Sequence, residues 1–223
     1  MRARLVAILL LSFATVAGAQ APMLVVEDWT KSAVGTKGLP PDWKAQNWGS
    51  PKYDFEIVTD ENQRALRMKS ANEGSLASRD IKGKVNLKET PILEWSWKVT
   101  TLPKNGDSCK KATDDQAAQV YVVWPRFPEA VRSRVLGYVW DTTEPVGTVC
   151  RSEKSGTVTY FVIRSGTADL GKWLTERRNV CEDYKRVYNE DCEPASAVSV
   201  AIDSNDTSST AEAFVGAIFF KRP

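Results

Sequence analysis

Histidine is absent from all 223 residues of the chain. This absence excludes Ser-His-Asp and Cys-His catalysis, histidine general bases and His-ligated zinc. Cysteine is sparse, and its four residues show no C-x-x-C spacing that would support a thiolate zinc site. Any catalysis must therefore rest on carboxylates, tyrosine, lysine, arginine or a bound hard cation.

Long apolar runs are lacking except at the N-terminus. Arg2 and Arg4 precede the stretch LVAILLLSFATVAGA, in which Ala17 and Ala19 form an A-x-A cleavage pattern. This arrangement predicts a secretory signal peptide over residues 1–19, which is too short for a permanent membrane span. We therefore expect an exported protein, periplasmic or extracellular, after cleavage near Ala19.

The mature chain also lacks a net charge of either sign. Loss of Arg2 and Arg4 with the signal peptide leaves equal numbers of basic and acidic side chains. This balance favours neither nucleic acid nor an anionic membrane as a partner. No later apolar stretch reaches the ~20 residues that cross a bilayer, so we expect no stable membrane insertion. Residues 20–223 suit one domain, which we expect to be a monomer.

Alternation of apolar and polar residues dominates the rest of the sequence. The clearest example is PILEWSWKV, residues 91–99, where two tryptophans, a leucine and a valine share one face. Turn-rich stretches separate the strand-like segments. Further predicted strands cover residues 23–29, 54–59, 64–70, 75–81, 117–124, 134–140, 156–165, 196–203 and 211–220.

One segment has a helical pattern instead. In LGKWLTERRNVCEDYKRVY, residues 170–188, the side chains Trp173, Arg177, Val180 and Tyr184 recur at steps of four and three. Many strands and one such segment predict a mainly β fold. We expect an antiparallel β-sandwich of jelly-roll type with one packed amphipathic helix.

Four cysteines in an exported protein indicate two disulfides with three possible connectivities. If Trp124 pairs with Val135, continuing that antiparallel ladder outward brings the first two cysteines face to face. The last two cysteines are then left to close a short loop. The predicted disulfides are Cys109–Cys150 and Cys181–Cys192.

Several motifs together resemble an uncharacterised bacterial family, domain of unknown function 3047. They are EWSWKV, DDQAAQVYVVW, GYVW, WLTERRNVCEDYKRVY and AIDSNDTSSTAEAFVGAIFF, which follow one another from about Trp95 onward. The resemblance implies a secreted β-sandwich protein with no established activity. It therefore provides no catalytic residue, and the four cysteines look like a feature of this member.

Asp114 and Asp115 stand directly before the strand that ends at Trp124. Such a pair could act as acid and base or supply oxygen ligands to calcium, and it could equally cap a turn. Our leading interpretation is a salt bridge that fastens the helix to the sheet through Arg177 or Arg178. The alternative is that these arginines bind an anion or a uronate.

Other acidic side chains extend the set of candidates. Glu94, Glu176 and Asp203 could join the aspartate pair in carboxylate-dependent catalysis. The turn DSNDT, residues 203–207, also offers Asp203 and Asp206 as calcium ligands, although the spacing departs from an EF-hand loop. A tight turn built on its own side chains is the alternative, and we expect no other cofactor.

Tryptophan is abundant, with eight residues, and two of them lie in a Pro/Gly-bearing loop. Trp43 and Trp48 could form a platform for sugar stacking, or they could plug the edge of the sandwich. Trp95, Trp97, Trp124 and Trp140 occupy strand positions that favour the core.

Three functions follow from these observations. The leading hypothesis is a non-catalytic binding module for carbohydrate or cell-envelope glycan, with Trp43, Trp48, Arg177 and Arg178 as ligand-binding residues. The first alternative is a carboxylate-dependent glycoside hydrolase or polysaccharide lyase. Its catalytic residues would come from Asp114, Asp115 and Glu176, with Glu94 and Asp203 as further candidates. The second alternative is a purely structural envelope protein.

Overall fold

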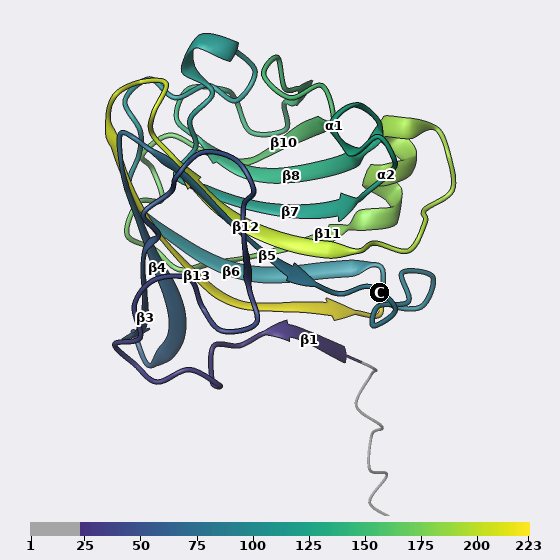
Figure 1. The fold of residues 1–223 in the computed structure, drawn as a ribbon, viewed down its shortest axis with the longest axis horizontal. Helices are drawn as coiled ribbons and strands as arrows, with labels where there is room; N and C mark the ends of the chain where they lie inside the picture. The colour runs from purple at the N-terminus through teal and green to yellow at the C-terminus, as the bar shows by residue number, and fades with distance from the viewer. Residues whose placement is uncertain (1–22) are drawn as a thin grey trace, which may run out of the picture.

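The computed structural model describes residues 23–223, and the predicted signal peptide lies outside them. Two sheets pack face to face, and the helix α2 lies at one end of them (Figure 1). In the described residues, sheet A contains, in spatial order, β11 (Leu174–Asn179), β6 (Ile92–Thr101), β13 (Thr210–Lys221), β4 (Gln63–Ala71) and β3 (Asp54–Asp60), with β1 (Met23–Glu27) also beside β13. Sheet B contains β2 (Lys44–Ala45), β5 (Gly74–Asp80), β12 (Ala197–Asp203), β7 (Ala118–Trp124), β8 (Arg134–Asp141), β10 (Val158–Ser165) and β9 (Val149–Arg151).

This architecture confirms the predicted mainly β sandwich. Neighbouring strands are antiparallel except β8 and β10, which pair in parallel. Short helical elements connect the strands: a 3₁₀ turn (Lys111–Thr113), α1 (Glu129–Arg132) and α2 (Val180–Tyr188). No helix within residues 23–223 is long and apolar enough to cross a membrane.

The core lies between the sheets and is rich in aromatic rings. Trp95 and Trp97 of β6 are fully buried and meet edge to face, with ring centroids 5.3 Å apart. From sheet B, Tyr138 stacks on Trp95 at 5.3 Å and Trp140 meets Trp97 at 6.0 Å. The period-two pattern of β6 forms a strand because it buries this one face, and each such ring contributes several kcal/mol through burial.

The predicted helix over residues 170–188 is wrong in its first half. Residues 174–179 form β11, which pairs with the open edge of β6, and the helix begins only at Val180. Asn179 sets this boundary, because its side-chain oxygen accepts the backbone N–H groups of Cys181 and Glu182. Because β11 alternates inward and outward, Arg177 points to solvent rather than along a helical stripe.

Both predicted disulfides are present, Cys109–Cys150 and Cys181–Cys192. The strand register from which Cys109–Cys150 was predicted is wrong, however. Trp124 pairs with Arg134, and Cys150 lies on β9, which pairs with β10 rather than continuing the β7–β8 ladder. The bond therefore joins the β6–β7 loop to the edge of sheet B. Two disulfides fit a protein that folds in an oxidising compartment.

Candidate functional site

Asp114 lies in the β6–β7 loop just before β7 and is almost completely buried. Its carboxylate accepts hydrogen bonds from Gln116 Nε2 at 2.8 Å and from Ser152 Oγ at 3.1 Å. Burial raises the pKa of Asp114, and these two hydrogen bonds partly oppose that shift. The carboxylate is thus held by neighbouring loops and has little access to solvent.

Asp115 is fully buried and binds a different loop. Its two carboxylate oxygens accept the backbone N–H groups of Asp206 and Thr207 at 3.1 and 2.7 Å. The β6–β7 and β12–β13 loops therefore meet at the end of the sandwich opposite α2 (Figure 1). Asp115 thus fastens the β6–β7 loop to the β12–β13 loop, while Asp114 fastens it to Ser152, between β9 and β10.

Asp203, at the end of β12, joins this group. Burial raises its pKa to about 8, and the nearby charge of Asp115 acts in the same direction. Asp206 forms an ion pair with Lys154. Within residues 23–223, neither Asp203 nor Asp206 belongs to a group of three ligand atoms close enough for one metal ion. The arrangement gives the calcium prediction no support.

The predicted salt bridge from Asp114 or Asp115 to Arg177 or Arg178 is wrong. The arginines lie on β11 opposite Glu94 and Leu93, near the start of β6, whereas the aspartates follow its far end. Arg178 pairs with Asp183 of α2, with Nε 2.9 Å from the carboxylate. Arg177 is exposed and pairs with Glu94 at 3.4 Å.

The glutamate candidates are also engaged in structural contacts. Glu176 is buried and accepts hydrogen bonds from Trp97 Nε1 at 3.1 Å and Arg164 Nε at 2.7 Å. Glu94 lies on the opposite face of sheet A, paired with Lys221 and Arg177. These two carboxylates therefore cannot serve one reacting bond together.

The two loop tryptophans have different environments. Trp43 is buried, stacks on Trp29 with ring centroids 5.4 Å apart, and donates its Nε1 hydrogen to Glu27 at 3.0 Å. It has no exposed face for stacking and plugs the edge of the sandwich. Trp48 is 59% exposed, so it alone of the two can meet a ligand.

A cleft that the sequence analysis missed lies on the outer face of sheet A. It has a volume of about 580 Å³, and a second hollow of about 330 Å³ continues it over β4 and β13. We call the two together the β3–β4 cleft, since they share Lys52, Asp54 and Lys69. Their charged side chains point away from the core because Phe55 and Met68 point into it.

Backbone contacts build the walls of the β3–β4 cleft. Residues 35–38 run along the free edge of β3, where the Gly38 N–H donates to the Phe55 carbonyl at 2.9 Å. On the other side, Tyr53 fixes the loop that contains Trp48 and Lys52. Its hydroxyl accepts the Gln46 N–H at 2.8 Å and donates to a carbonyl of β5 at 3.1 Å.

Charged groups on the cleft floor are held in fixed positions. Arg67 Nε donates to Glu212 Oε1 at 2.7 Å, and its Nη1 lies 3.8 Å from Glu56. Burial opposes ionisation of Glu212, but hydrogen bonds from Arg67 and Thr100 lower its pKa below the usual value. The cleft thus offers preorganised donors and acceptors to a polar molecule.

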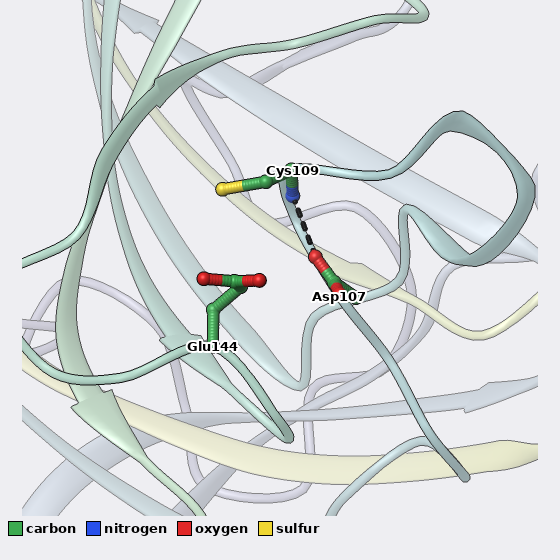
Figure 2. Close-up of side chains that lie close together, drawn as sticks. All are labelled: Asp107, Cys109 and Glu144. Atoms are coloured by element: carbon green, nitrogen blue, oxygen red, sulfur yellow. Dashed lines mark hydrogen bonds between the residues drawn. The ribbon is translucent and has the colours of Figure 1, made fainter.

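A third group brings two carboxylates near a sulfur. The ligand atoms of Asp107, Cys109 and Glu144 lie within 4.8 Å of one another (Figure 2). The Cys109 sulfur is bonded to Cys150 and so cannot act as a thiolate ligand. Asp107 also accepts the Cys109 N–H at 3.0 Å and pairs with Lys110. This group stabilises the loop and does not fit a metal ion.

The fold defines the class of protein as a two-sheet β-sandwich. The chain belongs to the family described as protein of unknown function DUF3047, whose model matches residues 41–219. No curated protein matches the sequence significantly.

Several solved structures are similar in outline. The CBM22-1 xylan-binding domain from Paenibacillus barcinonensis is 11% identical, with a TM-score of 0.42 over 92% of this chain and 98% of that chain. A family 11 carbohydrate-binding module from Clostridium thermocellum is 12% identical, with a TM-score of 0.44 over 86% and 98%. The family 30 module of a cellulosomal cellulase from the same organism is 9% identical, with a TM-score of 0.45 over 90% and 98%. With TM-scores below 0.5, these similarities carry no argument about function.

Proposed function

We propose that the protein is a non-catalytic module that binds a glycan chain in the β3–β4 cleft. The observation that carries this proposal is that two neighbouring hollows on the outer face of sheet A share three charged side chains, Lys52, Asp54 and Lys69. Small-molecule sites are usually enclosed and apolar, whereas the larger hollow of this cleft is lined mainly by charged side chains. A chain rich in hydroxyl groups matches such a surface.

The side chains of the cleft support the same proposal. An ion pair holds Arg67 and Glu212 in place. Their planar polar groups are therefore already ordered, and binding a ligand costs little further side-chain entropy. The exposed ring of Trp48 lies on the loop that supplies Lys52 to the cleft. A tryptophan face can stack on the apolar face of a sugar ring.

Native affinity electrophoresis tests the proposal. The gels contain soluble neutral or acidic polysaccharides, with calcium or with a chelator, and are stained afterwards for loss of polymer. We expect at least one polymer to retard the protein without being degraded. If no polymer in the panel retards the protein, the proposal is contradicted and the structural envelope hypothesis is left.

Cleft variants make this prediction specific. We expect Arg67→Ala to weaken retardation about tenfold, a loss typical of a central binding residue, and Trp48→Ala, whose ring lies on the neighbouring loop, to weaken it less. Trp48 is largely exposed, so its replacement should change the free energy of unfolding of the protein by about 0.5 kcal/mol or less. Arg67→Ala removes a hydrogen bond to Glu212 and should lower it by about 1 to 2 kcal/mol, so binding is compared at a temperature where both variants are folded. Matched controls are Arg177→Ala, on the opposite edge of sheet A, and Phe127→Ala, an exposed ring elsewhere. Equal effects in variants and controls would contradict the assignment.

A carboxylate-dependent hydrolase or lyase is the second candidate. The observation in its favour is the meeting of Asp114, Asp115 and Asp203, two of which have raised pKa values, as acid catalysts often do. Against it, internal hydrogen bonds engage all three carboxyl groups. A cleared zone in the gel that disappears in Asp114→Asn would favour this candidate.

A further inference from the structure

The charges of the β3–β4 cleft are unevenly distributed along its length. The larger hollow is lined by more basic than acidic side chains: Lys37, Lys52, Arg67 and Lys69 against Asp54 and Glu56. The smaller hollow adds only acidic groups, Glu73 and Glu212, to the charged residues that the two share. The cleft therefore has a basic end and an acidic end.

Two cations of the larger hollow have no acidic partner among the ion pairs of the described residues. Arg67 pairs with Glu212 and Glu56, and Lys69 Nζ lies 3.9 Å from Glu212. Among the ion pairs within residues 23–223, none involves Lys37 or Lys52. The excess positive charge of the larger hollow therefore resides on these two lysines, whereas the two hollows together have as many acidic as basic side chains.

The backbone fixes where both lysines begin. Lys37 forms an isolated β-bridge with Glu56, and the flanking Thr36 carbonyl accepts the Ile57 N–H at 2.8 Å. Lys52 directly precedes Tyr53, whose hydroxyl is hydrogen-bonded on two sides. Both ammonium groups therefore project from anchored segments that wall the same hollow.

Building on the proposed function, we propose that the cleft selects glycans that carry carboxylates. The carboxylate of a uronic acid residue lies in the larger hollow between Lys37 and Lys52, and the chain continues toward Glu212. An ammonium group binds a carboxylate as a point charge without needing a fixed orientation, which suits the flexible side chain of lysine. The fixed carboxylate of Glu212 accepts hydrogen bonds from hydroxyl groups of the neighbouring sugar.

The test compares two polymers that differ in one group. Polygalacturonate and the same polymer after reduction of its carboxyl groups to alcohols are cast in native gels at low and high salt. We expect the protein to bind polygalacturonate at least tenfold more tightly at low salt. The preference should shrink at high salt, because exposed charges are screened.

A charge-matched pair of variants locates the effect. Lys37→Gln/Lys52→Gln is expected to lose about tenfold in affinity for polygalacturonate and to keep its affinity for the reduced polymer. The control Lys172→Gln/Lys185→Gln removes the same charge from exposed positions outside the cleft and should behave as the wild type.

The outcomes separate this inference from the proposed function. Equal binding of both polymers would overturn the carboxylate inference and leave glycan binding intact. A preference for polygalacturonate that both double variants weaken equally would overturn the assignment to Lys37 and Lys52. If neither these polymers nor the wider panel retards the protein, glycan binding itself fails.

Discussion

Replacing Cys109 and Cys150 together by serine is expected to lower the free energy of unfolding by about 4 kcal/mol. The disulfide joins positions 41 residues apart, and a cross-link of that span restricts the unfolded chain by roughly this amount. The bond also fastens the β6–β7 loop, which carries Asp114 and Asp115, to the edge of sheet B. Urea denaturation followed by tryptophan fluorescence measures the change, which corresponds to roughly 8 to 16 °C in melting temperature.

The second disulfide provides the matched control. Cys181 and Cys192 are only 11 residues apart, so the corresponding serine variant should lose less stability, about 3 kcal/mol. A loss of less than about 1 kcal/mol in the Cys109/Cys150 variant would show that hydrogen bonds alone hold the loop.

Asp203→Asn is expected to stabilise the protein at neutral pH. In the folded protein, burial and the neighbouring Asp115 raise the pKa of Asp203 from 3.8 to about 8. The folded state therefore retains a proton at pH 7 that the unfolded chain releases, which costs on the order of 4 kcal/mol. Asparagine resembles the protonated acid, and its oxygen can still accept the Asn205 N–H.

The pH dependence gives the sign of this effect. Below about pH 4, Asp203 is protonated in both the folded and the unfolded state, so it does not lower the free energy of unfolding and this part of the stability is fully present. As the pH rises, the unfolded state releases this proton first, so the free energy of unfolding decreases until the folded state also releases it, above about pH 8. Urea denaturation between pH 4 and 9 should show the wild type losing stability over this range relative to Asp203→Asn.

A fully exposed aspartate serves as the control for this series. Asp191 is fully exposed in the folded protein, so the curve of Asp191→Asn should follow that of the wild type at every pH. Parallel curves for the wild type and Asp203→Asn would show that Asp203 titrates normally in the folded protein.

Strand positions could be predicted from the sequence because burial of one face imposes an alternating pattern. The segment over residues 170–188 shows where such patterns fail. Trp173, Arg177 and Val180 satisfy a helical spacing, yet an open edge of β6 was available to pair with residues 174–179. Pairing with β6, which is distant in the sequence, makes residues 174–179 a strand rather than a helix. The pattern of neighbouring residues holds no information about this pairing.

The candidate site was harder to predict for a related reason. Trp43 and Trp48 lie close together in the sequence on either side of β2, and contacts with Trp29 and Glu27 bury the first of them. The β3–β4 cleft draws its walls from separate segments whose lysines resemble ordinary surface charges. A weak signal was present in the charged residues that alternate on the outer face of β3 and β4, such as Glu56 and Arg67.

Lysine footprinting with a retarding polysaccharide tests glycan binding in the β3–β4 cleft most directly. The protein is acetylated briefly with an amine-reactive ester, with and without the polymer, and each lysine is quantified by mass spectrometry. The account predicts that Lys37 and Lys52 become protected while Lys172 and Lys185 react as before. Unchanged reactivity of Lys37 and Lys52 at a polymer concentration that fully retards the protein would contradict binding in the cleft.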